Sequence, residues 1–176
     1  QLSAINAANP DAVAVITFDE AKVVVPALVG SGYPGNQLYF VDGNLADYSA
    51  DFTAGTLEGV KGTLPGAESS QEFKDALLAV DPTLKDYSYA PESYDATILT
   101  ALAAIAAGDD SGEAIASQLE AVSKEGEKCT EFKECADLLA DGTDIDYDGK
   151  SGPVEFSDKG DPTEATIGVY QYGADN

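Results

Sequence analysis

The first evidence for the fold class is the stretch Asp11-Ala-Val-Ala-Val-Ile-Thr-Phe18. Its β-branched and apolar run is typical of a buried strand in a parallel sheet. We expect a helix over 19–29, which begins near Ala21 or is kinked, because Pro26 fits poorly inside a helix. The segment 37–41 (Gln-Leu-Tyr-Phe-Val) predicts a second strand. Strand, helix and strand together form a β-α-β unit, whose crossover should be right-handed.

Helical patterns fill the middle of the chain. Ser69 and Glu72 have the spacing of a capping box, which predicts a helix directly behind them. The segment 94–107 carries apolar residues at helical spacing and ends before Gly108, a helix stop signal. Further helices are expected within 110–122 and over 130–140, and a last strand over 165–172. The sequence therefore predicts an α/β fold.

The composition excludes several classes of function. The 176 residues include 32 acidic residues and 9 lysines, which gives a net charge of −23. Such a surface repels phosphate backbones and anionic lipid, so nucleic-acid binding is excluded. Without His there is no Ser-His-Asp triad and no imidazole metal ligand, and without Arg there is no bidentate phosphate clamp. We therefore expect no enzyme. No apolar run approaches the roughly 18 residues of a membrane span.

One acidic segment has the pattern of a calcium-binding loop. Asp144, Asp146 and Asp148, followed by Gly149 and Glu155, satisfy the spacing of an EF-hand loop in full. In such a loop the carboxylates surround a hard cation, and the Glu binds it with both oxygens. However, residues 141–143 separate the segment from the helix expected before it, and Val154-Glu-Phe156 behind it looks like a strand and not a helix. A solvated, Asp-rich turn explains the same residues, so calcium is a weak candidate and no metal site is assigned.

The two cysteines, Cys129 and Cys135, fit no zinc signature. On one continuous helix they would lie too far apart for a disulfide. If the helix begins near Glu131 and Cys129 lies in the preceding loop, the bridge is feasible, and it indicates an oxidising compartment. The alternative is a pair of thiols, with Cys135 packed beside Phe132. We favour the disulfide.

Polar residues follow both strands of the β-α-β unit. Thr17, Phe18 and Asp19 come at the end of the first strand, and Asp42 begins the turn after the second. Ligands of open α/β sheets bind at the carboxyl ends of the strands. A carboxylate beside an aromatic ring can hold an ammonium group. Ordinary βα turns also favour Asp, Gly and Asn, so the residues alone leave both interpretations open.

A series of segments resembles the carboxyl-terminal half of a branched-chain amino-acid binding protein of an ABC transporter, a family with the type 1 periplasmic-binding-protein fold. Each segment is weak alone, but their order and spacing run through nearly the whole chain. They are Asn9-Pro-Asp-Ala-Val13, Phe40-Val-Asp-Gly-Asn44, Leu57-Glu-Gly-Val-Lys-Gly-Thr63, Tyr94-Asp-Ala96, Tyr147-Asp-Gly-Lys-Ser-Gly-Pro153, Phe156-Ser-Asp-Lys-Gly-Asp161 and Gly168-Val-Tyr-Gln171. The acidity and the segment with the two cysteines resemble proteins of an actinobacterial or other high-GC lineage, or of a halophile.

The resemblance implies Rossmann-like lobes that are present only in part. Residues 1–62 would form the later part of the second ligand-binding lobe, and residues 63–150 the helical part that returns to the first lobe, including the cysteine-containing insertion. Residues 151–176 would form a crossing segment and the final strand, and the hinges would lie near 62–66 and 147–153. In the family, the acidic residue matching Asp42 receives the α-ammonium group of the ligand, and an aromatic residue matching Phe18 forms a pocket wall, with Asp19 as the other match.

The implied function is capture of a branched-chain or similar small amino acid or amide for import, outside the cytoplasm: periplasmic, secreted or lipid-anchored. The partners would be an ABC permease in the membrane and the amino-terminal half of the same protein, and no organic cofactor is expected. A ligand-sensing ectodomain of the same fold and a calcium-stabilised surface module are the alternatives.

Overall fold

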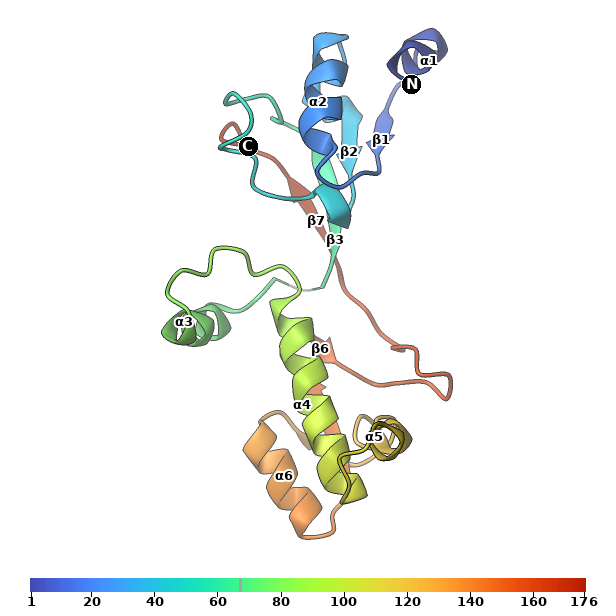
Figure 1. Ribbon diagram of the computed structural model, residues 1–176, viewed down its shortest axis with the longest axis vertical. Coiled ribbons are helices and arrows are strands. Elements are labelled where there is room, and N and C mark those ends of the chain that lie inside the picture. The colour runs from blue at the N-terminus through green and yellow to red at the C-terminus, as the bar shows by residue number, and fades with distance from the viewer. Residues whose placement is uncertain (67) are drawn as a thin grey trace. The chain divides into compact units, whose positions relative to one another are not determined.

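The computed structural model describes residues 1–66 and 68–176, which fold as two compact units (Figure 1). Unit 1 comprises residues 1–65 and 167–176, and unit 2 comprises residues 66–166. The chain thus passes from unit 1 to unit 2 after residue 65 and returns after residue 166. Of the two expected hinges, the one near 62–66 lies where the chain leaves unit 1, and the one near 147–153 lies inside unit 2. Within the described residues, no helix combines the length and the apolar character that a membrane span needs.

Unit 1 is built on a four-stranded sheet of order β1-β2-β3-β7. The strands β1, β2 and β3 are parallel, and β7 is antiparallel to β3. The predicted β-α-β unit is present, and its helix begins at Ala21 as expected, with Pro26 inside it on the exposed side. The elements are α1 (Leu2–Ala8), β1 (Val13–Val15), α2 (Ala21–Gly30), η1 (Gly35–Gln37), β2 (Leu38–Phe40), η2 (Asp42–Asn44), β3 (Lys61–Pro65) and β7 (Ile167–Gln171).

The core of unit 1 lies between α2 and one face of this sheet. Val25 and Leu28 of α2 are buried with Val15, Leu38 and Phe40 of the strands. These strand residues alternate with exposed ones, because successive side chains of a strand point to opposite faces. One face of each strand therefore lies in the core, although continuous apolar runs, and not an alternation of polar and apolar residues, mark β1 and β2 in the sequence.

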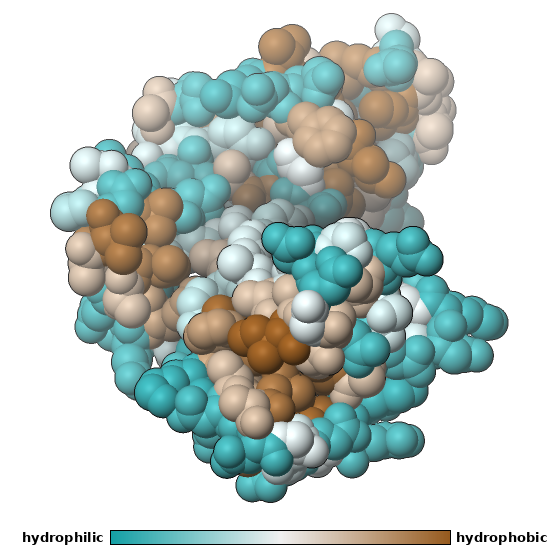
Figure 2. Space-filling view, turned by 60° about the horizontal axis from the view of Figure 1, so that its bottom comes forward, coloured by the Kyte–Doolittle hydropathy of each residue, from teal (hydrophilic) through white to brown (hydrophobic). Residues whose placement is uncertain are grey.

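Unit 2 combines four helices with a small sheet of order β4-β5-β6, in which β4 and β5 are parallel. The buried core lies between α4 and β5 and includes Leu99, Leu102, Ile145 and Tyr147. Figure 2 shows apolar residues that also reach the surface of this unit. Ile105 of α4, for example, is 43% exposed. The elements are α3 (Gln71–Val80), α4 (Ala90–Ala107), α5 (Gly112–Gln118), β4 (Glu127–Cys129), α6 (Phe132–Ala140), β5 (Ile145–Gly149) and β6 (Gly152–Pro153).

Two local predictions in unit 2 were wrong. The N-cap of α3 is Ser70 and not Ser69, because the Ser70 hydroxyl accepts a hydrogen bond from Phe73 N–H at 3.2 Å. The Asp-rich segment is not a turn, since 145–149 forms strand β5, with Ile145 and Tyr147 buried. The alternation of Asp with apolar residues is thus the period of a strand with one buried face.

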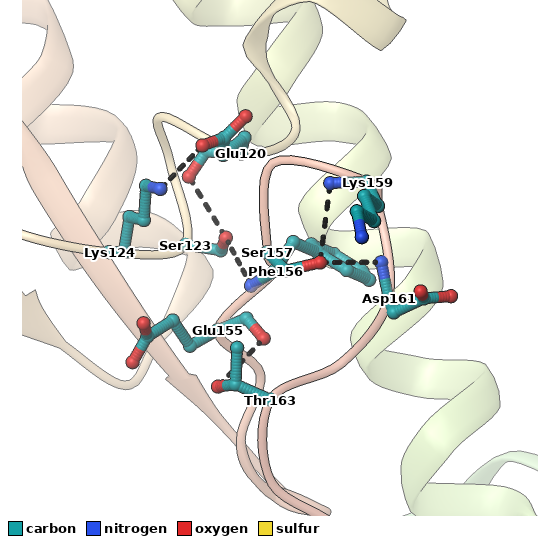
Figure 3. Close-up of polar contacts among 9 residues, drawn as sticks. All are labelled: Glu120, Ser123, Lys124, Glu155, Phe156, Ser157, Lys159, Asp161 and Thr163. Atoms are coloured by element: carbon teal, nitrogen blue, oxygen red, sulfur yellow. Dashed lines mark hydrogen bonds and ion pairs between the residues drawn. The ribbon is translucent and has the colours of Figure 1, made fainter.

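A short hairpin follows β6. The Phe156 N–H donates to the Ser123 hydroxyl, which in turn donates to the Glu120 carbonyl, and this ties the hairpin to the turn behind α5 (Figure 3). Across the hairpin, Thr163 N–H donates to the Glu155 carbonyl at 2.9 Å. Because Ser123 is fully buried, its hydroxyl is satisfied by these two bonds and fixes the start of the return path to unit 1.

Candidate functional site

The carboxyl ends of β1 and β2 lie side by side in unit 1. The two strands are parallel, and Val15 pairs with Phe40 at their ends. The segments 17–19 and 42–44 follow directly, so the fold brings all four predicted binding residues to one edge of the sheet. This edge is where α/β sheets hold their ligands.

Asn44 joins the two strand ends. Its side-chain amide donates to the Val15 carbonyl at 2.7 Å and to the Thr17 hydroxyl at 2.9 Å. Its amide oxygen accepts from Val41 N–H at 2.9 Å. Asn44 is buried, and it makes three of the four hydrogen bonds that an amide side chain can form. The separation of the two turns is therefore fixed by a satisfied side chain and not by the turns themselves.

The second contact across this edge is between Phe18 and Gly43. A Cβ on Gly43 would lie 2.9 Å from the Phe18 ring and 2.9 Å from the Thr17 carbonyl oxygen. Only glycine lets the backbone and the ring approach so closely. The Phe18 ring rests on this glycine and is otherwise 72% exposed. An exposed ring held in one place is suited to form the wall of a binding site.

Carboxylates lie in both turns at this edge. Asp19 and Asp42 are both exposed at this edge, and Glu20 accepts a hydrogen bond from Phe18 N–H at 3.0 Å. Backbone hydrogen bonds hold the pKa of Glu20 below its usual value, so its carboxylate is charged at neutral pH. The edge therefore combines negative charge with an aromatic face, the two features that attract an ammonium group.

Tyr48 packs behind the edge. Its hydroxyl donates to the Asn44 carbonyl at 3.0 Å. Burial, and then the charges of Asp19 and Asp51, raise the pKa of Tyr48. The ring stacks on Phe52 at 5.1 Å between centroids and supports the turn from the core side. The phenol is thus a neutral donor that holds the turn and is not a general acid near pH 7.

The opposite edge of unit 1 carries a hollow of about 500 Å³. It lies at the amino ends of the strands, away from the segments 17–19 and 42–44. Among its lining residues are Asn6, Asn9, Asp11, Ser31, Tyr33 and Gln37. None of the binding residues predicted from the sequence lines this hollow. Substitutions in the hollow therefore serve as controls in the same unit.

Unit 2 contains a buried carboxylate that the sequence analysis did not single out. Asp95 of α4 is 1% exposed and accepts four hydrogen bonds, one from strand β5 and three from the tip of the β5–β6 hairpin. Tyr147 Oη donates at 2.9 Å, Lys150 N–H at 2.8 Å, and Ser151 donates through its N–H at 2.7 Å and its hydroxyl at 2.5 Å. Burial, and then the bond to Asp95, raise the pKa of Tyr147. The arrangement fixes the hairpin tip.

The acidic segment 144–148 holds a lysine. Lys128 Nζ lies 3.0 Å from Asp146 and 3.0 Å from Asp148, and its pKa is raised by these bonds. Both carboxylates project from one side of β5, and Asp144 precedes the strand. Within the described residues, no cluster of three or more acidic or cysteine side chains is arranged to hold a metal ion. The observed partner of this segment is an ammonium group.

The predicted disulfide is confirmed. Cys129 ends β4, Cys135 lies in the first turns of α6, and their Cα atoms are 5.5 Å apart. The helix begins at Phe132, so the two residues do not share a helix, as the bridge requires. The difference from the prediction is that Cys129 belongs to a strand and not to a loop. Both residues are buried in the core of unit 2.

The chain resembles known proteins in its fold and not in its sequence. No protein-family model matches the sequence, and no curated protein matches it either. Among solved structures, the leucine-binding protein LivK of Thermotoga maritima is similar, with a TM-score of 0.70 and 18% identity. The match covers 100% of this chain and 45% of that one. A chain described as an ABC transporter permease, from the Pseudomonas fluorescens group, has a TM-score of 0.56 and 19% identity, with 100% and 44% covered.

The chain spans less than half the length of both neighbours. At this level of identity the likeness concerns the fold and not the ligand. The mixed α/β architecture of both units nevertheless matches the binding protein over all 176 residues. The chain therefore shares the α/β fold of this leucine-binding protein over the part of that protein which the match covers.

Proposed function

We propose that this chain is part of an extracytoplasmic substrate-binding protein that captures a branched-chain or similar small amino acid, or a related amide, for an ABC permease. In this proposal the chain binds and releases its ligand and catalyses no reaction. The ligand is held at the carboxyl edge of unit 1, and the longer protein supplies the groups that hold its carboxylate. A ligand-sensing ectodomain would use the same edge with a different membrane partner.

The observation that supports the proposal is the meeting of Phe18 and Asp42 at one edge, held by Asn44. Asp42 is the proposed acceptor for the ligand ammonium, because a carboxylate forms the stronger, charge-assisted kind of hydrogen bond with it. Phe18 is the proposed wall for the aliphatic side chain, and Asp19 and Thr17 complete the polar rim. The disulfide agrees with an oxidising compartment outside the cytoplasm.

The test is an NMR titration of the ¹⁵N-labelled chain, which detects the weak binding expected when part of a site is missing. We expect L-leucine to shift the amide signals of 17–19 and 42–44 and to leave the residues of the opposite hollow unmoved. 4-Methylpentanoate, which lacks the ammonium group, should shift them much less. Loss of one charge-assisted hydrogen bond lowers affinity by roughly tenfold or more, so Asp42→Asn should weaken leucine binding by that factor.

Asp11→Asn is the matched control, because Asp11 is an exposed carboxylate of the same unit at the opposite edge. It should leave the affinity for leucine unchanged. Equal effects of the two substitutions would show that only net charge matters. If no amino acid or amide perturbs the segments 17–19 and 42–44, this edge is not the ligand site. The membrane protein that co-purifies with the ligand-loaded protein distinguishes transport from sensing.

A further inference from the structure

Ile16 is an exposed aliphatic residue at the candidate site that the sequence analysis did not single out as a binding residue. It follows directly after Val15, the last residue of β1, and it is 77% exposed. A single exposed isoleucine needs no explanation by itself, because soluble proteins expose many scattered apolar side chains. Two features distinguish Ile16: its backbone is held on both sides, and it lies two residues before Phe18.

The chain on both sides of Ile16 is held by one side chain. The amide nitrogen of Asn44 donates to the carbonyl of Val15 and to the hydroxyl of Thr17, the residues before and after Ile16. Because Asn44 is buried and belongs to the neighbouring turn, these two bonds fix the path of the chain through Ile16. Ile16 is therefore exposed, yet its backbone is held in place.

The side chains of this segment alternate in exposure. Thr17 is half-buried and bonded to Asn44, whereas Ile16 and Phe18 on either side of it are 77% and 72% exposed. This alternation is that of an extended chain, in which residues two apart lie on the same side with a spacing of about 6.5 Å. Ile16 and Phe18 therefore present two neighbouring apolar side chains to solvent.

Both side chains are suited to select a ligand by its shape. Ile16 is β-branched, so its χ1 angle is restricted and little rotamer freedom is lost when a ligand packs on it. The Phe18 ring rests on Gly43, whose missing side chain leaves room for it. The exposed carboxylate of Asp42 follows the neighbouring strand. The edge thus combines apolar surface with a charged group, as ligand sites for small molecules do.

We propose that Ile16 is a specificity-determining residue of this site: together with Phe18 it packs on the aliphatic side chain of the ligand, while Asp42 holds the ammonium group. The inference rests on the proposed function and deepens it, because it names a residue that distinguishes a large aliphatic amino acid from a small one. Each additional buried methylene group raises the affinity by about fourfold. Leucine therefore gains from contact with Ile16, whereas the single methyl group of alanine gains little.

The test compares L-leucine with L-alanine in an NMR titration of the ¹⁵N-labelled chain and of its Ile16→Ala variant. The substitution should lower the affinity for leucine by about fourfold, the factor for one lost methylene contact, and leave the affinity for alanine unchanged. Ile16→Val, which keeps the β-branch, should retain most of the affinity for leucine. Because Ile16 is exposed, both variants should fold with an unchanged Tm.

Val23→Ala is the matched control. Val23 is a β-branched residue of the same unit, 75% exposed, and it belongs to α2 and not to the candidate site. Its substitution removes a similar amount of exposed apolar surface. It should change neither the affinity for leucine nor the affinity for alanine, and an effect equal to that of Ile16→Ala would overturn the inference.

The remaining outcomes separate this inference from the proposed function. An equal loss of affinity for leucine and for alanine in Ile16→Ala would mean that Ile16 acts on the shape of the edge and not on the ligand side chain. An unchanged affinity for leucine would mean that the ligand side chain lies elsewhere. Both results overturn the inference and leave the proposed function standing. If neither amino acid shifts the signals of 17–19 and 42–44 in the native chain, both fail.

Discussion

The carboxylate of Asp95 occupies the space that Gly149 leaves by having no side chain. A Cβ on Gly149 would overlap with the carboxyl group of Asp95, which is turned toward the hairpin tip to accept its four hydrogen bonds. The two residues are 54 positions apart in the sequence and come from a helix and a strand. This contact fixes where the hairpin lies on α4.

The contact predicts a measurable coupling. Asp95→Ala leaves buried donors of Tyr147 and Ser151 unpaired and should lower the free energy of unfolding by about 3 kcal/mol. Gly149→Ala should be destabilising in the native chain because of the overlap, but nearly neutral when combined with Asp95→Ala. Urea unfolding of the single and double variants measures this. Additive effects would contradict the contact. Asp110→Ala, at an exposed position, is the control.

Asn44 should contribute more than its neighbours to the stability and the geometry of the candidate site. Asn44→Asp keeps the acceptor for Val41 N–H but replaces the donor to the Val15 carbonyl by a charged acceptor. We expect a loss of about 2 kcal/mol in the free energy of unfolding and broadened amide signals at 17–19. Asp47→Asn, on the same connection but exposed, should change neither. Unchanged signals in the Asn44 variant would mean that the turns hold themselves.

The disulfide should stabilise the protein by restricting the conformations of the unfolded chain. It closes a loop with a sequence separation of 6, for which chain entropy predicts a contribution of about 2 kcal/mol. Cys129→Ser together with Cys135→Ser should lower the free energy of unfolding by this amount. Because both cysteines are buried, dithiothreitol should reduce the folded chain only as fast as it unfolds. Fast reduction without unfolding would show that the bond is accessible.

Alkaline pH should destabilise the fold. Burial raises the pKa of Tyr172 to about 12 from an ordinary value of 10.0, and burial also raises the pKa of Tyr147. Because these pKa values are higher in the folded than in the unfolded state, their contribution is complete below pH 10. It is lost as the pH rises through the folded values.

Circular dichroism and tyrosinate absorbance, followed together, measure this loss. Tyr172→Phe should flatten the fall in stability between pH 10 and 12, whereas Tyr39→Phe, at an exposed position, should not. Constant stability across this range in the wild-type chain would rule out the raised pKa of Tyr172.

Salt should stabilise the protein, and calcium should add nothing specific. Unit 2 holds three quarters of the acidic residues, so self-repulsion is concentrated there. Raising KCl from about 0.01 to 1 M shortens the screening length from about 30 to 3 Å. We expect Tm to rise by at least roughly 2–4 °C, equivalent to about 1 kcal/mol. Lys128 already pairs with both Asp146 and Asp148, and it leaves no cluster of unpaired carboxylates at this strand.

For that reason, CaCl₂ and MgCl₂ of equal ionic strength should give equal Tm. A calcium-specific rise in Tm that is lost in the Asp146→Asn variant would restore the calcium-site hypothesis for the segment 144–155.

Much of unit 1 could be predicted, because its strands and helix are marked by local patterns. The β-branched run before Phe18, the helix start at Ala21 and the second strand were all recoverable from single segments. Strand β5 was missed because its outward positions are Asp, which is rare in strands and common in turns. The alternation with Ile145 and Tyr147 was the available signal, but the calcium-loop spacing competed with it.

The position of the candidate site could be predicted from the sequence, but the contacts that hold it together could not. Placing Asp42 and Phe18 at one edge needed only the parallel pairing of two neighbouring strands. The role of Asn44 needed the distance between the two turns, which only the folded chain defines. The role of Asp95 could not be predicted for the same reason. A single Asp near the start of a helix forms no sequence pattern that indicates its hydrogen bonds to a distant hairpin.

The sequence by itself determined the α/β class, the acidity and the edge at which Phe18 and Asp42 lie, and it favoured the disulfide. These features follow from local periodicity, charge and spacing, which act within one or two elements. Only the tertiary structure decided that Asn44 joins the strand ends, that Asp95 anchors the hairpin and that Lys128 pairs with Asp146. Each of these depends on buried or paired groups from distant segments, whose partners are fixed by packing and not by neighbours in the chain.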